Sequence, residues 1–291
     1  MRTLNASPWF LVSLACLTTL ACQPVWAQDM LAPPDLPVPV VPVVQMPAAP
    51  ATPWEGALGA NLSFRPEYPG SDKRITKISP ALFLRYGRFT ITNASGFVTR
   101  RADDVVRGLG LDMLESDRLR VNLALRFDAG RSEGNSDALK GMGDIKPTVR
   151  ARMTGSWRGD DGLRLGAAWS VDAFGRGGGN FGDVSLGWDT RLGPTTTAGV
   201  GASLSLAGDR YMQTYYGVSE AQAARSGYPM YTPGAGLRDV SFSANMRTDL
   251  GADWLMLGGA SVSRLLGPAA NSPLTQSRSG WGISVGLARR F

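Results

Sequence analysis

The chain has 291 residues, of which 36 are glycine and none is histidine, and its formal net charge is +6. Without histidine it cannot build a Ser–His or Cys–His nucleophile or a His-ligated metal site. Its two cysteines, Cys16 and Cys22, lie in a predicted leader, so the mature chain has no thiol for disulfides or zinc. Acids lie close to most of its arginines, which argues against nucleic acid as a partner.

Residues 1–27 have the pattern of a signal peptide. Arg2 precedes an apolar stretch over residues 9–21, and Val25-Trp26-Ala27 offers the exit that signal peptidase reads, which predicts cleavage before Gln28. The apolar stretch is shorter than the roughly 20 residues of a membrane-spanning helix. Lipidation at Cys22 is the alternative, although Thr19 stands where a lipoprotein signal usually has leucine.

Residues 28–53 form a proline-rich segment, with eight prolines between Leu31 and Pro53. Proline at this density removes amide donors and favours extended polyproline conformations. The segment lacks the flanking cation that usually accompanies a proline-rich docking peptide. It is therefore predicted to be an extended, disordered spacer.

From Trp54 to Phe291, apolar and polar residues alternate in segments separated by polar or glycine-rich breaks. The alternation is clearest over residues 119–128, 148–157 and 239–247, where each strand has one apolar and one ionic face. It is weakest between Arg88 and Leu114. Twelve segments are predicted in total, centred near residues 60, 82, 92, 109, 123, 151, 168, 187, 202, 245, 259 and 286.

The breaks alternate between short turns and long polar stretches. Residues 86–88, 158–162 and 192–194 are short, whereas the long stretches cover residues 65–76, 131–143, 209–238 and 267–278. This is typical of an outer-membrane barrel. Residues 54–291 are therefore predicted to form an all-β fold: a transmembrane antiparallel up-and-down β-barrel of about 12 strands. An even strand number places both termini in the periplasm.

A secreted β-sandwich is the competing fold, because it also alternates. Aromatic residues toward the strand ends favour the barrel, since they form girdles at the two membrane interfaces. The chain also ends on Phe291, after Ile283, Val285 and Leu287 in one phase, like the signal read by the bacterial barrel-insertion machinery. Arg289 departs from that signal, where an apolar residue is usual.

Three sequence blocks resemble the MltA-interacting protein (MipA)/OmpV family of outer-membrane proteins. They are YPGSD at residues 68–72, YYGVSEAQAARSGYPMYTPGAGLRDV at 215–240 and SRLLGPAANSPLT at 263–275. The resemblance implies a non-enzymatic scaffold in outer-membrane lipid that brings together a murein transglycosylase and a murein synthase. It implies no catalytic residue and no cofactor. Family members often carry acids where this chain has Pro268 and Asn271, which removes contacts that those carboxylates make.

Charged residues of the strands are predicted to form a network inside the barrel. The set comprises Arg120, Arg126, Arg150, Arg152, Arg164, Arg191 and Arg247, with Asp112, Asp128, Asp172, Asp183, Asp189 and Asp249. Two carboxylates can cleave a glycosidic bond, so a murein-cleaving pair is conceivable. Opposite charges that pair and fill the lumen are the favoured interpretation, because an unpaired buried charge is costly. Neither a catalytic residue nor a metal site is predicted.

The longest polar stretch carries five tyrosines that are candidates for contact with a ligand: Tyr211, Tyr215, Tyr216, Tyr228 and Tyr231. The same tyrosines would serve a folded lid over the barrel. The scaffold function therefore has two alternatives, a narrow channel and a surface protein that binds a solute or antibiotic or mediates adhesion.

Overall fold

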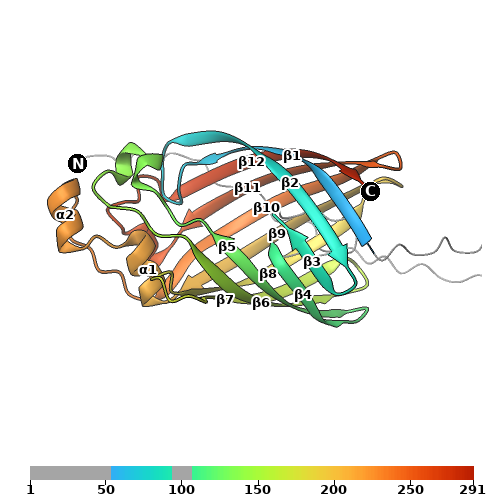
Figure 1. Ribbon diagram of the computed structural model, residues 1–291, viewed down its shortest axis with the longest axis horizontal. Helices are drawn as coiled ribbons and strands as arrows, with labels where there is room; N and C mark the ends of the chain where they lie inside the picture. Colours follow the sequence, from blue (N-terminus) through green and yellow to red (C-terminus); the bar gives the residue numbers. More distant parts are fainter. Residues whose placement is uncertain (1–53, 94–106) are drawn as a thin grey trace, which may run out of the picture. The chain divides into compact units, whose positions relative to one another are not determined.

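The computed structural model describes residues 54–93 and 107–291. The predicted signal peptide and proline-rich spacer lie outside these residues. Twelve antiparallel strands close into a barrel, in which β1 pairs with both β2 and β12 (Figure 1). The predicted all-β barrel of 12 strands is confirmed.

Each predicted segment centre falls within one strand. The weakest pattern corresponds to the shortest strands, β3 and β4. The strands are β1 (Trp54–Pro66), β2 (Arg74–Tyr86), β3 (Phe89–Thr92), β4 (Gly108–Glu115), β5 (Leu119–Asp128), β6 (Thr148–Arg158), β7 (Leu163–Asp172), β8 (Asn180–Arg191), β9 (Thr196–Ala207), β10 (Gly236–Leu250), β11 (Trp254–Leu265) and β12 (Ser279–Arg290).

The long connections contain helices that the alternation pattern does not predict. α1 (Asp209–Tyr216) and α2 (Glu220–Ser226) lie between β9 and β10, and α3 (Gly267–Ala270) follows β11. Two 3₁₀ turns, Glu133–Asn135 and Asp137–Leu139, lie between β5 and β6. Within the described part of the chain, no helix has the length and apolar character needed to cross a membrane.

The outer face of the barrel is apolar and exposed, as lipid contact requires. On β5, Leu123 and Leu125 are exposed and Phe127 is 74% exposed, whereas the intervening Ala124 is buried. Alternation with a period of two sends successive side chains to opposite faces of a strand. The polar residues in the other phase therefore face the lumen.

The two ends of the barrel differ. Five connections of two to four residues lie at one end, here called the short-turn end, and the long connections lie at the other, the loop end. Phe291 is at the short-turn end, where its N–H donates to Gly56 O at 3.0 Å and fastens β12 to β1. The rings of Trp54 and Tyr86 are 4.6 Å apart there. Trp281 and Phe64, with ring centroids 5.6 Å apart, lie toward the loop end.

The inner wall is also uneven. On β5 to β8 it carries large charged side chains, whereas on β9 to β12 glycine and serine dominate. Ser243 and Ser261 are exposed although their phase faces inward, so this part of the lumen holds open space. Nearer the short-turn end the small-residue wall ends in a buried apolar cluster that includes Phe83 and Leu255.

Candidate functional site

Most of the charged residues predicted to face the lumen form ion pairs, either within one strand, with the neighbouring strand or with the next strand but one. Their closest N···O distances are 2.6 Å for Arg150–Asp128, 2.8 Å for Arg152–Asp183, 2.8 Å for Arg164–Asp189 and 3.4 Å for Arg247–Asp249. Arg120 pairs with Glu115, and Arg290 also pairs with Asp249. Paired charges need less solvation than isolated ones, so the wall tolerates so many arginines.

The remaining predicted residues are placed differently. Asp112 is buried, accepts a hydrogen bond from Asn122 Nδ2 at 3.0 Å and lies 3.9 Å from Arg85. Arg126 lies directly opposite Arg150 in the β5–β6 register. Arg126 and Arg191 have no ion pair with an acid of the described residues, and Arg191 is exposed at the short-turn end.

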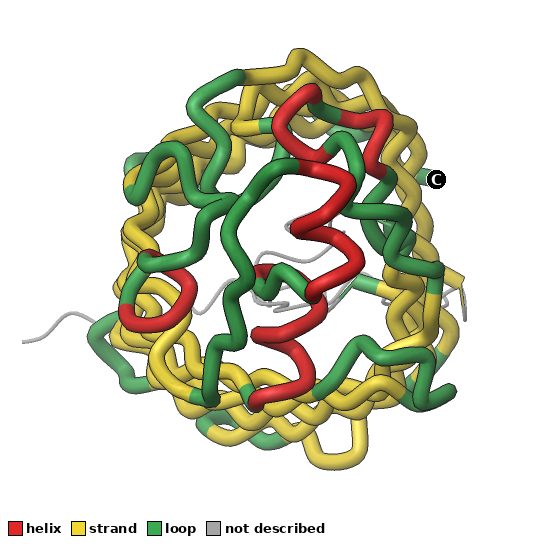
Figure 2. Tube along the Cα trace, turned by 90° about the vertical axis from the view of Figure 1, so that its left-hand side faces the viewer, coloured by secondary structure: helices red, strands yellow, loops and turns green. Residues whose placement is uncertain are grey.

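The long connections fold together into a cap over the loop end. We use loop cap for residues 67–73, 129–147, 173–179, 208–235 and 266–278. Figure 2 shows helices lying across the opening of the barrel. α1 is anchored by Met212 and Tyr216, which are four residues apart, lie on one helix face and pack with Ala207 and Leu265 of the wall.

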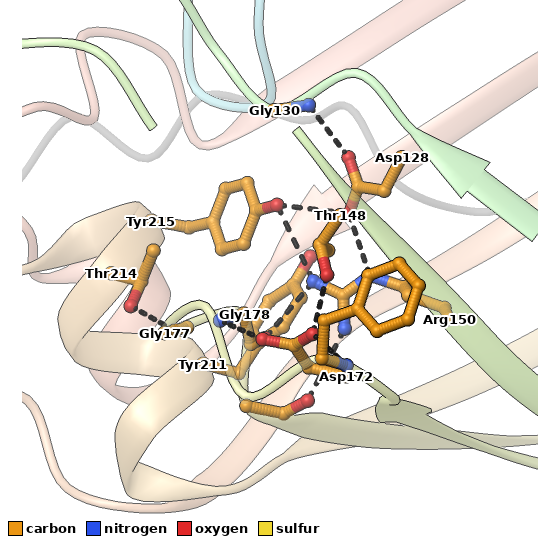
Figure 3. Close-up of polar contacts among 12 residues, drawn as sticks. Asp128, Gly130, Thr148, Arg150, Asp172, Gly177, Gly178, Tyr211, Thr214 and Tyr215 are labelled. Carbon is orange, nitrogen blue, oxygen red and sulfur yellow. Dashed lines mark hydrogen bonds and ion pairs between the residues drawn. The ribbon is translucent and has the colours of Figure 1, made fainter. Parts of the chain in front are cut away.

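Arg150 joins the wall to the cap (Figure 3). Its side chain is 5% exposed, and its Nε donates to Asp128 Oδ2 at 2.6 Å. Its two Nη atoms donate to Gly179 O at 3.2 Å and Gly178 O at 2.9 Å, within the β7–β8 connection. Tyr215 of α1 donates its hydroxyl to Asp128 at 3.0 Å. One arginine–aspartate pair thus holds the β7–β8 connection and α1.

Asp172 fixes the same connection from β7. Its carboxylate accepts hydrogen bonds from the Thr148 hydroxyl, from Gly178 N at 2.8 Å and from Phe174 N at 3.2 Å. The Thr214 hydroxyl of α1 donates to Gly177 O. Figure 3 shows these contacts beside Arg150, at the foot of α1.

An aromatic column packs beside Arg150. The ring of Tyr211 stacks on that of Tyr215 at 4.5 Å and lies 5.1 Å from Phe181 of β8. The guanidinium carbons of Arg150 and Arg238 are 5.3 and 5.1 Å from the Phe181 ring. Cations over aromatic faces are attracted by the ring quadrupole, more strongly where water is excluded.

Arg238 reaches this column because of a β-bulge. The β9–β10 register shifts between Leu237 and Asp239, and both Arg238 and Asp239 point inward. A bulge places an extra residue in one strand and re-aims its side chain. The alternation in the sequence assigns Arg238 to the outer face, so sequence reasoning missed it.

The three sequence blocks at residues 68–72, 215–240 and 263–275 meet inside the loop cap. Tyr68 of the first block donates its hydroxyl to Leu274 O of the third at 3.0 Å. Ser272 of the third block donates to Tyr216 O of the second at 2.6 Å, and Tyr231 donates to Pro268 O at 2.8 Å. These blocks therefore specify one another's positions in the folded cap.

The five candidate tyrosines all belong to this cap. Tyr216 is buried; Tyr211, Tyr215 and Tyr231 are half-buried, and Tyr228 is partly covered by the apolar cluster around Met142. Burial raises the pKa of Tyr215 to about 12, with the Asp128 carboxylate adding to the effect. Burial likewise raises the pKa of Tyr68 to about 12. Tyr68, Tyr215 and Tyr231 each donate a hydroxyl hydrogen bond within the cap or to the barrel wall.

Arg131 is the cation of the cap that sequence reasoning missed. It donates to Tyr215 O at 2.8 Å, and burial lowers its pKa. Over residues 54–93 and 107–291, no group of three or more acids or cysteines is arranged to hold a metal ion. Each of the six aspartates predicted to face the lumen accepts a hydrogen bond or forms an ion pair. This arrangement stabilises a closed cap and favours structural pairing over a glycosidase dyad, which needs one protonated carboxyl group.

Residues 58–291 match the family model described as MltA-interacting protein MipA. Among curated proteins, no sequence matches this one. Similar solved structures include an outer membrane channel from Pseudomonas putida, at 12% identity and a TM-score of 0.39, covering 84% of this chain and 97% of the other. An anion-selective porin from Comamonas acidovorans has 11% identity and a TM-score of 0.37, covering 82% and 98%. A Pseudomonas aeruginosa FadL homologue has 12% identity and a TM-score of 0.37, covering 82% and 90%.

Proposed function

The chain belongs to the family of MltA-interacting proteins, MipA, and from this premise we propose that it is a non-enzymatic outer-membrane scaffold. Its partners are a murein transglycosylase and a murein synthase of the cell envelope. The family membership over residues 58–291 is the observation that carries this proposal. The interlocked cap adds support, because a barrel whose opening is crossed by packed loops and helices is better suited to holding partners than to passing solutes.

The short-turn end faces the periplasm in this proposal, and both termini lie there. An even number of strands returns the chain to the side where it starts, and bacterial barrels keep their short turns in the periplasm. The murein enzymes work on that side. The loop cap then faces the outside of the cell.

The rim of the short-turn end offers few free cations for an acidic partner. Arg290 pairs with Asp249, and Arg289 lies 3.7 Å from Asp253. Arg88 donates to the backbone oxygens of Asp112 and Met113. Arg191 is exposed and has no such contact with a described acid.

Recruitment is therefore assigned to residues 28–53. An extended proline-rich segment rises about 3.1 Å per residue, so it reaches up to about 80 Å from the barrel. Such a reach extends away from the membrane, toward the murein side.

Deletion of residues 31–52, with the signal peptide and barrel kept, is the direct test. A matched control replaces the same residues with a glycine–serine segment of equal length, which keeps the number of residues but neither the extended conformation nor the proline chemistry. Co-purification of murein enzymes from detergent-solubilised envelopes is measured. We expect at least a tenfold loss in both variants. If the deletion variant recovers as much murein enzyme as the full-length protein does, the spacer is not the recruiting segment. If no murein enzyme co-purifies with the full-length protein, the scaffold proposal is wrong.

A narrow channel is the second candidate, supported by the open space beside the small-residue wall. Ser243 and Ser261 are exposed on that wall, as water-filled lumens require. The closed loop cap stands against steady flow. Conductance in planar bilayers distinguishes the two candidates.

A further inference from the structure

Two arginines point outward from the loop end of the barrel, into the zone where lipid headgroups lie. Arg74 on β2 shares its phase with Ile78, which is 74% exposed, and Arg264 on β11 shares its phase with Val262, which is 53% exposed. Both arginines are exposed. Neither forms an ion pair with an acid of the described residues.

An aromatic surface supports this pair of cations. The guanidinium carbon of Arg74 lies 4.2 Å from the centre of the Trp281 ring, which contacts Phe64. The strands β2, β1, β12 and β11 are consecutive neighbours in the barrel. At about 4.8 Å per strand, the two arginine backbones are roughly 15 Å apart. Because arginine side chains are long, one large headgroup can contact both.

The short-turn end lacks this arrangement. Arg289 also points outward there, but its guanidinium lies 3.7 Å from Asp253. Arg118 of a short turn forms an ion pair with Asp160 at 2.5 Å. Arg289 and Arg118 thus have acids of their own, whereas Arg74 and Arg264 need an anion from outside the described chain. A charged side chain on a lipid-facing wall is stable only at headgroup level, beside an opposite charge.

We propose that Arg74, Arg264 and Trp281 bind the phosphorylated glycolipid headgroup of the outer leaflet, of the lipid A type. The planar guanidinium matches phosphate with two parallel hydrogen bonds. The Trp281 ring packs at the boundary between headgroup and acyl chains, where aromatic side chains are stable. This inference rests on the proposed orientation, in which the loop end faces outside.

The test uses the mature full-length protein in detergent, with lipid binding titrated by native mass spectrometry. The probes are lipid A with both phosphates, the same glycolipid after enzymatic removal of the phosphates, and phosphatidylglycerol. We expect lipid A to bind at least tenfold more tightly than either other probe. The double variant Arg74→Gln, Arg264→Gln should lose at least tenfold in affinity, and Arg289→Gln, the matched control, should lose none.

Equal lipid A affinity of the double variant and the natural protein would overturn the site. If dephosphorylated lipid A binds as tightly as lipid A, the site does not recognise phosphate. If phosphatidylglycerol binds as tightly as lipid A, the site does not select a glycolipid. Heat-modifiable migration on gels reports folding of each variant. Arg264→Gln alone serves if the double variant does not fold, because Arg264 lacks the ring contact of Arg74. The measurement does not involve murein enzymes, so it can fail while the scaffold proposal stands.

Discussion

Arg150 is the residue on which wall and cap most depend. Its side chain is 5% exposed and donates to Asp128, Gly178 and Gly179, which belong to the wall and to the β7–β8 connection. Removal of one partner of a buried ion pair leaves the other charge uncompensated, at a cost of about 3 kcal/mol. We therefore expect Arg150→Ala to lower the free energy of unfolding by about that amount in urea titrations in lipid vesicles.

Arg126 provides the matched control, since it lies opposite Arg150 in register and lacks an ion pair with a described acid. Arg126→Ala should change the free energy of unfolding by about 1 kcal/mol or less. Arg150→Lys keeps the charge but not the fork of donors, so its effect should be intermediate. Equal effects of Arg150→Ala and Arg126→Ala would contradict the central position given to Arg150.

The cap tyrosines predict an alkaline transition. The pKa values of Tyr68 and Tyr215 are raised to about 12 in the folded protein, against about 10 when unfolded. A raised pKa contributes stability that is complete below pH 10 and is lost as pH rises toward 12. We expect the loop cap to become protease-sensitive over this range while far-ultraviolet circular dichroism still reports the barrel.

Tyrosinate absorbance gives an independent measurement of the same transition. The chain has 7 tyrosines, and the four cap tyrosines whose pKa burial raises should ionise later than a tyrosine in water: Tyr68, Tyr215, Tyr216 and Tyr231. Tyr215→Phe removes the hydroxyl that donates to Asp128 and should loosen the cap at neutral pH. Titration of every tyrosine together near pH 10 would show that the cap does not bury them.

At the scale of elements, the strands could be predicted because lipid outside and charge inside impose a period of two on residues such as 119–128. The helices of the cap could not, because α1 is short and depends on Met212 and Tyr216 packing against the distant Leu265. Short helices are marginal without such tertiary contacts. The bulge at Arg238 interrupts the period of two, so the alternation wrongly predicts that this side chain faces outward.

The candidate site was therefore predicted in part. The wall charges and the cap tyrosines carry a signal in the sequence, because arginine and aspartate in one strand phase must share the lumen. Their partners across loops carry none: the Tyr68–Leu274 hydrogen bond joins residues 206 positions apart. Recognition of the family blocks indicated that these segments belong together, but only the fold shows that they touch.

The seating of α1 depends on Gly179, which offers an element-scale prediction. Its φ is +60°, and a Cβ there would lie 2.3 Å from Tyr211 N. We expect Gly179→Ala to push α1 from the mouth of the barrel, so that proteolysis of residues 208–235 rises at least tenfold. The backbone strain of a side chain at positive φ destabilises the folded protein by about a further 1 kcal/mol.

Gly175 separates the two effects of that substitution. It lies in the same connection at φ +65°, yet a Cβ there has no atom within 4 Å. Gly175→Ala should therefore show the backbone strain without displacing α1, and its proteolysis rate should remain close to that of the natural protein. Similar rates for the two variants would mean that close approach to Tyr211 does not hold the helix.

For the whole molecule, conductance distinguishes a closed scaffold from a channel. Barrels of eight strands are filled by side chains and those of 16 leave an aqueous channel, so twelve strands lie between these limits. Here ion pairs such as Arg152–Asp183 narrow one wall, while Ser243 and Ser261 leave space along the other. Closure therefore falls mainly to the loop cap. We expect the natural protein to show little or no steady conductance in planar bilayers.

Replacement of residues 209–235 by a short glycine–serine turn tests whether the loop cap, and not the wall, blocks conductance. The replacement removes α1 and α2 but leaves β9 and β10 and their register with neighbouring strands. Steady openings smaller than those of a porin should then appear, since the space beside the small-residue wall becomes continuous with the outside. Gly175→Ala, which leaves α1 in place, should show no steady conductance. If the variant without residues 209–235 also shows no conductance, the cap is not the barrier. The wall charges and the apolar cluster at Phe83 and Leu255 then block the lumen. If the natural protein itself shows long-lived, porin-sized openings, the channel replaces the scaffold as the better account of this barrel.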